Sequence, residues 1–349
     1  MSRKTAPFRF PRSQNRTNRF FAAVPAAAKK GESPMPQPNV ICVVGPTACG
    51  KTKMGVLLAK RFDGEVVSVD SMQIYRGMTI GTAAPTIEEM DGVPHHMVAV
   101  ADPRESWSVA RFTKEADRCV QEILARGKRP ILVGGTGLYL DALVSGRTFA
   151  GGQAGGAVRQ ALQRRLAQEG IGPLFTELSQ VDPAAAERLH QGDEKRILRA
   201  LEVYYETGKT ITEHNEETQR LPRRYAAAYI GLAFRDRADM RALIDRRVDE
   251  MVSQGLLEEV DALLSDQLPP GSTALQAIGY KEFIAYREGQ CSLEEAVEEV
   301  KLCSRQYAKR QLTYLRRNRE IYWIYWEKER DFAKALQDAT EFLSALGLG

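Results

Sequence analysis

The fold of this chain is decided by one stretch, Gly45-Pro46-Thr47-Ala48-Cys49-Gly50-Lys51-Thr52, which has the form G-x-x-x-x-G-K-T. The apolar run 40–44 before it has the pattern of a buried strand, and residues 51–61 after it have a helical pattern. Glycines between a strand and a helix let backbone N–H groups surround a di- or triphosphate, where the helix dipole also favours an anion. The stretch therefore predicts a phosphate-binding loop. A glycine turn with an unrelated lysine is the alternative.

Two side chains of this loop and one beyond it have predicted roles. Lys51 is expected to contact the phosphates as a point charge, and Thr52 to offer its hydroxyl to a Mg²⁺ ion that bridges them. Asp70 ends a second predicted strand, residues 65–70. Ligands gather at the carboxyl ends of strands in an open α/β sheet, so Asp70 is expected to face the phosphate site. A strand-end aspartate that caps the next turn is the alternative.

The order of elements predicts an α/β protein: a parallel-sheet core like that of the P-loop NTPases, with a helical insertion and a helical C-terminal region. Strands are expected at 40–44, 65–70, 95–100, 129–133 and 226–234, and a second glycine turn, 134–137, follows the fourth of them. The predicted parts are a disordered basic extension (1–38), the first part of the core (39–145), the helical insertion (146–224), and the last core strand with the helical C-terminal region (225–349).

The composition is that of a soluble globular protein, with 43% hydrophobic and 27% charged residues. No apolar run approaches the ~20 residues that span a bilayer, so no membrane partner is expected. The five cysteines show no paired zinc spacing, and a reduced, cytoplasmic compartment is the simplest setting. Residues 1–38 hold eight Lys and Arg against Glu32 alone, which leaves a charge of −3 on the other 311 residues. This extension is interpreted as an arm that meets RNA, as an upstream start of little consequence, or as an organellar transit peptide.

Basic residues cluster in two places. Six cations and no acid lie between residues 301 and 317, and at 100° per residue they share one half of a helical wheel: Lys301, Arg305, Lys309, Arg310, Arg316 and Arg317. A face of one sign indicates a partner that carries phosphates, although an exposed basic helix without a partner is the alternative. The second cluster, 195–199, lies in the insertion. The aromatic run 322–326 could stack on bases, but we interpret it as core.

Six linked motifs in this chain resemble those of the tRNA dimethylallyltransferases (tRNA isopentenyltransferases). They occupy residues 45–52, 70–85, 133–139, 199–203, 276–281 and 309–316, in order and at compatible spacings, so the resemblance covers about 40–326. The resemblance implies transfer of a dimethylallyl group from dimethylallyl diphosphate to N6 of the adenosine immediately 3′ of the anticodon. The acceptors would be tRNAs that read codons beginning with U, and diphosphate would be released.

The resemblance also implies roles for particular residues. Asp70 would be the general base, Lys51 and Mg²⁺ on Thr52 would stabilise the leaving diphosphate, and Thr47 and Arg237 would assist. Contacts to the anticodon stem-loop are implied for five parts of the chain: Asp70, Ser71, Met72 and Gln73; Thr136; Lys195, Arg196, Ile197, Leu198 and Arg199; Gln276, Ala277, Ile278, Gly279, Tyr280 and Lys281; and Lys309, Arg310, Gln311, Leu312, Thr313, Tyr314, Leu315 and Arg316. A monomer is expected, because the helical additions are committed to RNA.

One residue departs from the family pattern. Cys49 stands where the family more usually has serine. A thiol at a helix N-terminus beside Lys51 is expected to have a lowered pKa and to be oxidisable. The hypothesis is that peroxide inactivates the protein and that Cys49→Ser resists.

Three other functions compete with this one. A P-loop small-molecule kinase with bound ATP would explain the loop and Asp70, but not the basic helix. An adenylate dimethylallyltransferase would share the chemistry on a free nucleotide. A non-catalytic RNA-binding protein would not need Lys51, Thr52 and Asp70 together.

Overall fold

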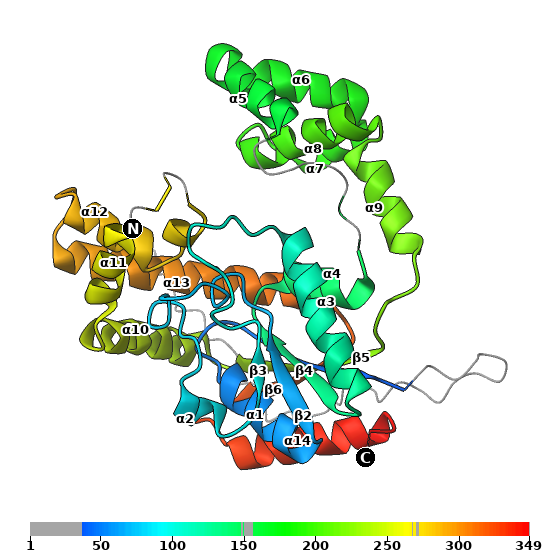
Figure 1. Ribbon diagram of the computed structural model, residues 1–349, viewed down its shortest axis with the longest axis vertical. Coiled ribbons are helices and arrows are strands. Elements are labelled where there is room, and N and C mark those ends of the chain that lie inside the picture. Colours follow the sequence, from blue (N-terminus) through cyan, green and yellow to red (C-terminus); the bar gives the residue numbers. More distant parts are fainter. Residues whose placement is uncertain (1–36, 148, 150–155, 267, 270–271, 349) are drawn as a thin grey trace, which may run out of the picture. The chain divides into compact units, whose positions relative to one another are not determined.

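The computed structural model describes residues 37–147, 149, 156–266, 268–269 and 272–348. The predictions for the N-terminal extension therefore fall almost wholly outside the described residues. The centre of the protein is a sheet of six parallel strands in the order β3-β2-β4-β1-β5-β6 (Figure 1). The strands are β1 (Val40–Val44), β2 (Gly64–Ser68), β3 (His95–His96), β4 (Arg129–Gly134), β5 (Ala227–Phe234) and β6 (Ile321–Trp326).

Both faces of this sheet are buried, as the continuous apolar runs of its strands require. Val40, Cys42 and Val44 of β1 pack into one hydrophobic cluster, and the alternate residues Ile41 and Val43 pack into a second. The first cluster includes α3 (Val109–Ala125) and α4 (Gly137–Ser145), and the second includes α1 (Lys51–Arg61) and α14 (Phe332–Ala345). The predicted phosphate loop joins β1 to α1, with the bounds expected from the sequence.

The remaining helices lie in three parts of the chain. Between β2 and β3 is α2 (Ile87–Met90), and after β5 come α10 (Arg237–Ser253), α11 (Leu256–Ser265), α12 (Tyr280–Arg287) and α13 (Leu293–Leu315), with the 3₁₀ turn η1 (Ala274–Gln276). The insertion consists of α5 (Ala157–Glu169), α6 (Ile171–Val181), α7 (Pro183–Arg188), α8 (Glu194–Thr207) and α9 (Ile211–Arg220). It has a hydrophobic cluster of its own, which includes Leu162, Leu174, Leu178 and Leu201. No helix within the described ranges combines the length and apolar character that crossing a membrane requires.

Two predictions about strands were wrong. The C-terminal region is not wholly helical, because the aromatic run forms the edge strand β6, which pairs with β5 along its whole length. In this run Ile324 and Trp326 are buried, Tyr322 and Trp323 pack partly buried against the core clusters, and Tyr325 is exposed, so the interpretation as core is confirmed for all of its residues except Tyr325. The expected strand 95–100 is only β3, because Met97 and Ala99 have φ angles of 62° and 51°, which end an extended strand.

Candidate active site

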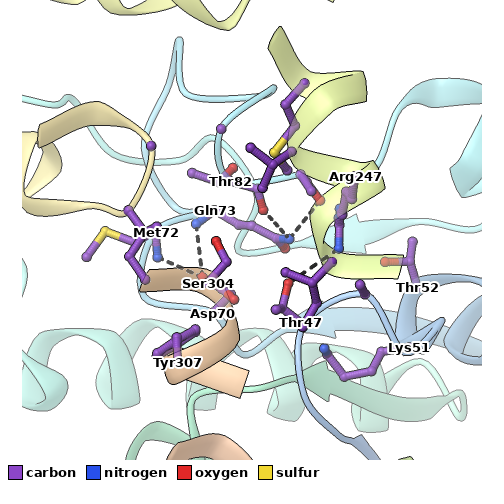
Figure 2. A pocket seen from close by; sticks show the side chains of 18 of the residues that line it. Thr47, Lys51, Thr52, Asp70, Met72, Gln73, Thr82, Arg247, Ser304 and Tyr307 are labelled. Atoms are coloured by element: carbon purple, nitrogen blue, oxygen red, sulfur yellow. Dashed lines mark hydrogen bonds between the residues drawn. The ribbon is translucent and has the colours of Figure 1, made fainter. Parts of the chain in front are cut away.

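The carboxyl ends of β1, β4 and β2 meet at one edge of the sheet and form the floor of a cavity of about 720 Å³. Residues of the phosphate loop, residues 70–73, residues 276–279 and Lys281 line it. Side chains from α10 and α13, among them Arg247 and Tyr307, also face it (Figure 2). Val69 N donates to Val133 O over 2.8 Å, which brings the residues after β2 against the glycine turn after β4. The cavity therefore unites segments that are far apart in the sequence.

The phosphate loop has the shape that its glycines predict. Gly50, the N-cap of α1, has a φ of 89°, a left-handed conformation that favours glycine. Lys51 donates from Nζ to Pro46 O over 2.7 Å, across the loop. Burial lowers the pKa of Lys51, because a desolvated ammonium is less stable than a neutral amine. Thr52 also lines the cavity, so Lys51 and Thr52 both lie where the sequence predicts them.

Two more cations reach this loop, and neither is the predicted one: Arg247, and Arg330, whose Nη1 donates to Ala48 O over 3.4 Å. Arg237 is the first residue of α10, is exposed, and does not line the cavity. Arg247 lies ten residues further along the same helix, about 15 Å away, and donates from Nη1 to Thr47 Oγ1 over 3.4 Å (Figure 2). Burial lowers the pKa of Arg247 as well. The sequence contains a signal for it, because Arg247 shares a helix face with the buried Met240 and Ile244.

Asp70 lies beside the loop with one oxygen engaged. Its Oδ1 accepts from Met72 N over 2.9 Å and from Gln73 N over 3.4 Å. Oδ2 has no hydrogen-bond partner among the residues that the structure describes, and it remains available to a substrate. Ser71 N donates to Thr136 Oγ1 over 3.3 Å. Burial raises the pKa of Tyr307 on α13 to about 12, and the negative charge of Asp70 makes a smaller contribution in the same direction.

Gln311 of α13 braces the two glycine turns against each other. Its Oε1 accepts from Thr47 N over 2.8 Å, and its Nε2 donates to Gly135 O over 3.1 Å. A Cβ at Gly135 would lie 2.1 Å from that nitrogen, so any other residue there would displace the Gln311 amide from this hydrogen bond. Gln311 is only 6% exposed, and its predicted contact with tRNA does not fit this position.

The structure divides the other predicted tRNA contacts into exposed and buried residues. Ile197 and Leu198 belong to the core of the insertion, and Tyr280 and Leu315 are buried in the main core, so these four cannot face RNA as the fold stands. Ala277 is 5% exposed and lines the cavity. Tyr314 donates to Asp141 Oδ2 over 2.6 Å, and Leu312 packs against a core cluster. Met72, Ile278 and Gly279 line the cavity. The residues with exposed side chains are Lys195, Arg196, Gln276, Lys281, Lys309, Arg310, Thr313 and Arg316, and Arg199 is partly exposed.

The six cations of residues 301–317 do not form a face of one sign. Lys301 lies 2.8 Å from Asp249, and Arg305 lies 2.5 Å from Asp245, so acids of α10 neutralise both. A wheel of residues 301–317 cannot show this, because Asp245 and Asp249 come from another element and Glu298, a second partner of Lys301 at 3.0 Å, precedes that window. The exposed cations Lys309, Arg310, Arg316 and Arg317 have no acidic partner in the part of the chain that the structure describes.

The prediction of a lowered pKa for the Cys49 thiol was wrong, while the hypothesis that peroxide inactivates the protein stays a prediction. Its side chain is fully buried, and burial raises the pKa of the thiol more than Lys51 beside it lowers it. A Cβ on Gly45 would lie 2.6 Å from Sγ, and Trp326 Nε1 donates to Cys49 O over 2.8 Å. The residue is a small packed side chain and not an activated thiolate.

The donor set of the cavity suits one kind of metal site. Among the described residues no three His, Cys, Asp or Glu side chains gather as metal ligands. Thr52 and Asp70 contribute one hydroxyl and one carboxylate to the cavity wall. Mg²⁺ is commonly held by one or two such groups together with substrate phosphates and water, so these residues fit Mg²⁺ bound with a diphosphate.

The fold and cavity define a phosphate-loop α/β protein with an acidic side chain facing the loop. The family model described as IPP transferase matches residues 73–318, and the isopentenyl transferase model matches residues 38–100. A tRNA dimethylallyltransferase of Caldanaerobacter subterraneus is 42% identical over 88% of this chain and 98% of its own length. That of Halalkalibacterium halodurans is 44% identical over 88% of this chain and 96% of its own. The chain belongs to the tRNA dimethylallyltransferase family.

Solved structures agree with this assignment. The tRNA isopentenylpyrophosphate transferase of Bacillus halodurans is 40% identical and superposes with a TM-score of 0.67, covering 89% of this chain and 97% of its own. A eukaryotic dimethylallyltransferase acting on tRNA is 29% identical with a TM-score of 0.75, covering 87% of this chain and 79% of its own. The predicted P-loop-like α/β core is confirmed.

Proposed function

We propose that this protein transfers a dimethylallyl group from dimethylallyl diphosphate to N6 of the adenosine immediately 3′ of the anticodon in tRNA, releasing diphosphate. The acceptors are tRNAs that read codons beginning with U. The observation that carries the proposal is the cavity in which a phosphate loop, several cations that include Lys51 and Arg247, and Asp70 converge. We also propose that the protein acts as a monomer, because the helical additions are expected to bind RNA.

The residues of the cavity divide the reaction between them. Lys51 and Arg247 bind the diphosphate and offset the charge that grows on it as the C–O bond breaks. Thr47 is fixed by Gln311 and Arg247 and orients the loop. Asp70 Oδ2 accepts a proton from the attacking amine, while Oδ1 stays fixed by Met72 N. The adenine must leave its stack to enter, which costs about a few kcal/mol.

Mg²⁺ is part of the proposal. Thr52 would hold it together with the diphosphate. When bound, the ion would supply positive charge to the leaving group. Independently of that contribution, Lys51 and Arg247 bind the diphosphate, Thr47 orients the loop, and Asp70 deprotonates the amine.

The test is mass spectrometry of nucleosides from unmodified tRNA after incubation with the protein, Mg²⁺ and dimethylallyl diphosphate. We expect adenosine to gain one dimethylallyl group, and Asp70→Asn to lower the rate by about 10²–10⁴-fold, the usual contribution of a general base. Asp63→Asn is the matched control, because Asp63 is an exposed turn residue with a φ of 46°, which asparagine also tolerates.

Each alternative outcome has a clear meaning. Transfer to AMP but not to tRNA would favour an adenylate dimethylallyltransferase. Consumption of ATP with small acceptors and no prenyl transfer would favour a kinase. Equal rates for Asp70→Asn and wild type would remove Asp70 from the role of base.

A further inference from the structure

One carboxylate outside the cavity lining collects five hydrogen bonds. Glu259 of α11 accepts at Oε2 from Thr79 N over 2.7 Å, from Thr79 Oγ1 over 2.9 Å and from Ile80 N over 2.8 Å. It accepts at Oε1 from Gly81 N over 2.9 Å and from Tyr280 OH over 2.5 Å. Three consecutive backbone N–H groups of the turn 79–83 are thus held by a side chain about 180 residues away, as the sequence separations of these bonds show.

The turn leads directly to the candidate base. Gln73 Nε2 donates to Ala83 O over 3.0 Å and to Thr82 O over 3.3 Å. Gln73 Oε1 accepts from Ser68 Oγ over 2.8 Å, which ties it to the end of β2. Gln73 N in turn donates to Asp70 Oδ1. A continuous set of hydrogen bonds therefore runs from Glu259 through the turn 79–83 and Gln73 to Asp70, and Figure 2 shows its inner part.

Tyr280 closes the same arrangement from α12. Its ring is buried, and a Cβ on Gly81 would lie 2.5–2.7 Å from the ring atoms, so the turn passes directly against it. Burial, and after it the charge of Glu259, raises the pKa of Tyr280, which keeps its hydroxyl a donor. Tyr280 follows residues 276–279, which line the cavity. Glu259 thus joins two walls of the cavity, the turn 79–83 and the segment 276–281.

We propose that Glu259 is a positioning residue, which fixes the turn 79–83 against Tyr280 and through Gln73 sets the orientation of Asp70. The kinetic part of this inference rests on the function proposed above. The charge and the two equivalent oxygens of the carboxylate are both required. A glutamine would turn an NH₂ group toward either the three donors at Oε2 or the two at Oε1, so neither orientation satisfies the turn.

The experiment compares Glu259→Gln with Glu258→Gln, a change of the exposed neighbour on the same helix. Hydrogen exchange of the peptide 77–85 and steady-state prenyl transfer are measured on the full chain, with melting temperature as the check of folding. We expect Glu259→Gln to speed exchange at residues 79–81 and to lower kcat by about 10–100-fold, as misplacement of a reacting group does. The KM for dimethylallyl diphosphate should change less than about twofold, because the phosphate loop is untouched. Glu258→Gln should resemble wild type in the exchange of residues 79–81, in kcat and in KM.

Several outcomes would overturn the inference. Exchange at residues 79–81 that matches wild type would show that Glu259 does not hold the turn. A rise in KM with unchanged kcat would place its effect in diphosphate binding. If Glu259→Gln does not fold, Tyr280→Phe removes one of the five donors, and unchanged exchange at Gly81 would then contradict the proposal. A wild-type protein without transfer activity would defeat the proposed function, while the exchange measurement would still test the hold on the turn.

Discussion

At the scale of single residues, the cavity contains two cations whose charged forms burial disfavours. The pKa values of Lys51 and Arg247 are both lowered by desolvation, and no carboxylate pairs with either of them among the described residues. Buried charge without a partner is costly, and an anion that binds between them removes that cost. Their arrangement is therefore suited to a diphosphate.

The contribution of Arg247 can be measured against a neighbouring arginine. Arg247→Ala should weaken diphosphate binding by roughly 10–100-fold, the equivalent of ~1.5–3 kcal/mol for a charged hydrogen bond. Arg246→Ala is the control, because Arg246 is exposed and lies near only Glu250 on its own helix. Titration calorimetry with inorganic diphosphate gives both affinities. Equal affinities for the two variants would show that Arg247 does not contact the ligand.

At the scale of elements, α13 has two different surfaces along its length. Its first half contacts α10 through the pairs Lys301–Asp249 and Arg305–Asp245. Its last turns place Gln311 under the phosphate loop and leave Lys309 and Arg316 exposed. One helix thus braces the site and presents charge beside it, so the predicted role in RNA binding falls on its C-terminal half alone.

This division predicts the salt dependence of tRNA binding. Lys309→Ala combined with Arg316→Ala should weaken binding and reduce the slope of log K against log salt by about 0.7–0.9 for each phosphate that the variant no longer neutralises. Arg118→Ala, on the exposed side of α3 near Glu115 and Glu122, should leave the slope unchanged. Filter binding from low to high salt measures both. An unchanged slope in the double variant would mean that these cations do not meet RNA phosphates.

At the scale of the whole molecule, stability depends on a buried carboxylate at the other end of the sheet. Glu65 of β2 is 5% exposed and lies 2.7 Å from both Arg126 and His96. Burial would raise the pKa of Glu65, but the hydrogen bonds from Arg126 and His96 outweigh it and hold that pKa below its usual range. The ionised group therefore joins β2, β3 and the end of α3.

The lowered pKa of Glu65 predicts how the stability of the protein depends on pH. A carboxyl whose folded pKa is lowered adds stability above its unfolded pKa of about 4.3, and the contribution is lost as the pH falls through the folded value. Glu65→Gln should lower the free energy of unfolding by about 1.5–3 kcal/mol at pH 7, and the difference should shrink below about pH 4. Denaturant titrations of wild type and Glu65→Gln at pH 7 and below about pH 4 test this. Glu327→Gln, in an exposed pair with Arg235, should stay within about 0.5 kcal/mol, and a Glu65 effect independent of pH would contradict the ionic explanation.

The sequence alone determined the parts of this protein that are local. The run 40–61 contains a strand, a glycine loop and a helix in one continuous segment, so its period and its glycines predicted β1, the loop and α1 with their bounds. Asp70 was placed at the site by one further rule, that parallel strands end at the same edge. The helical character of the insertion was predicted for the same reason, because helix signals are local.

Only the tertiary structure decided which distant residues complete the site. Thr47 meets Gln311 across 264 positions of sequence, and Arg247 and Glu259 reach the loops from α10 and α11. Acids of α10 pair with two of the six cations that were predicted to form a basic face. Burial raises the pKa of Cys49, which was predicted to be a reactive thiol. The physical reason is common to all of these: charge pairing and desolvation depend on the neighbours that folding supplies, and no periodicity along a single segment contains them.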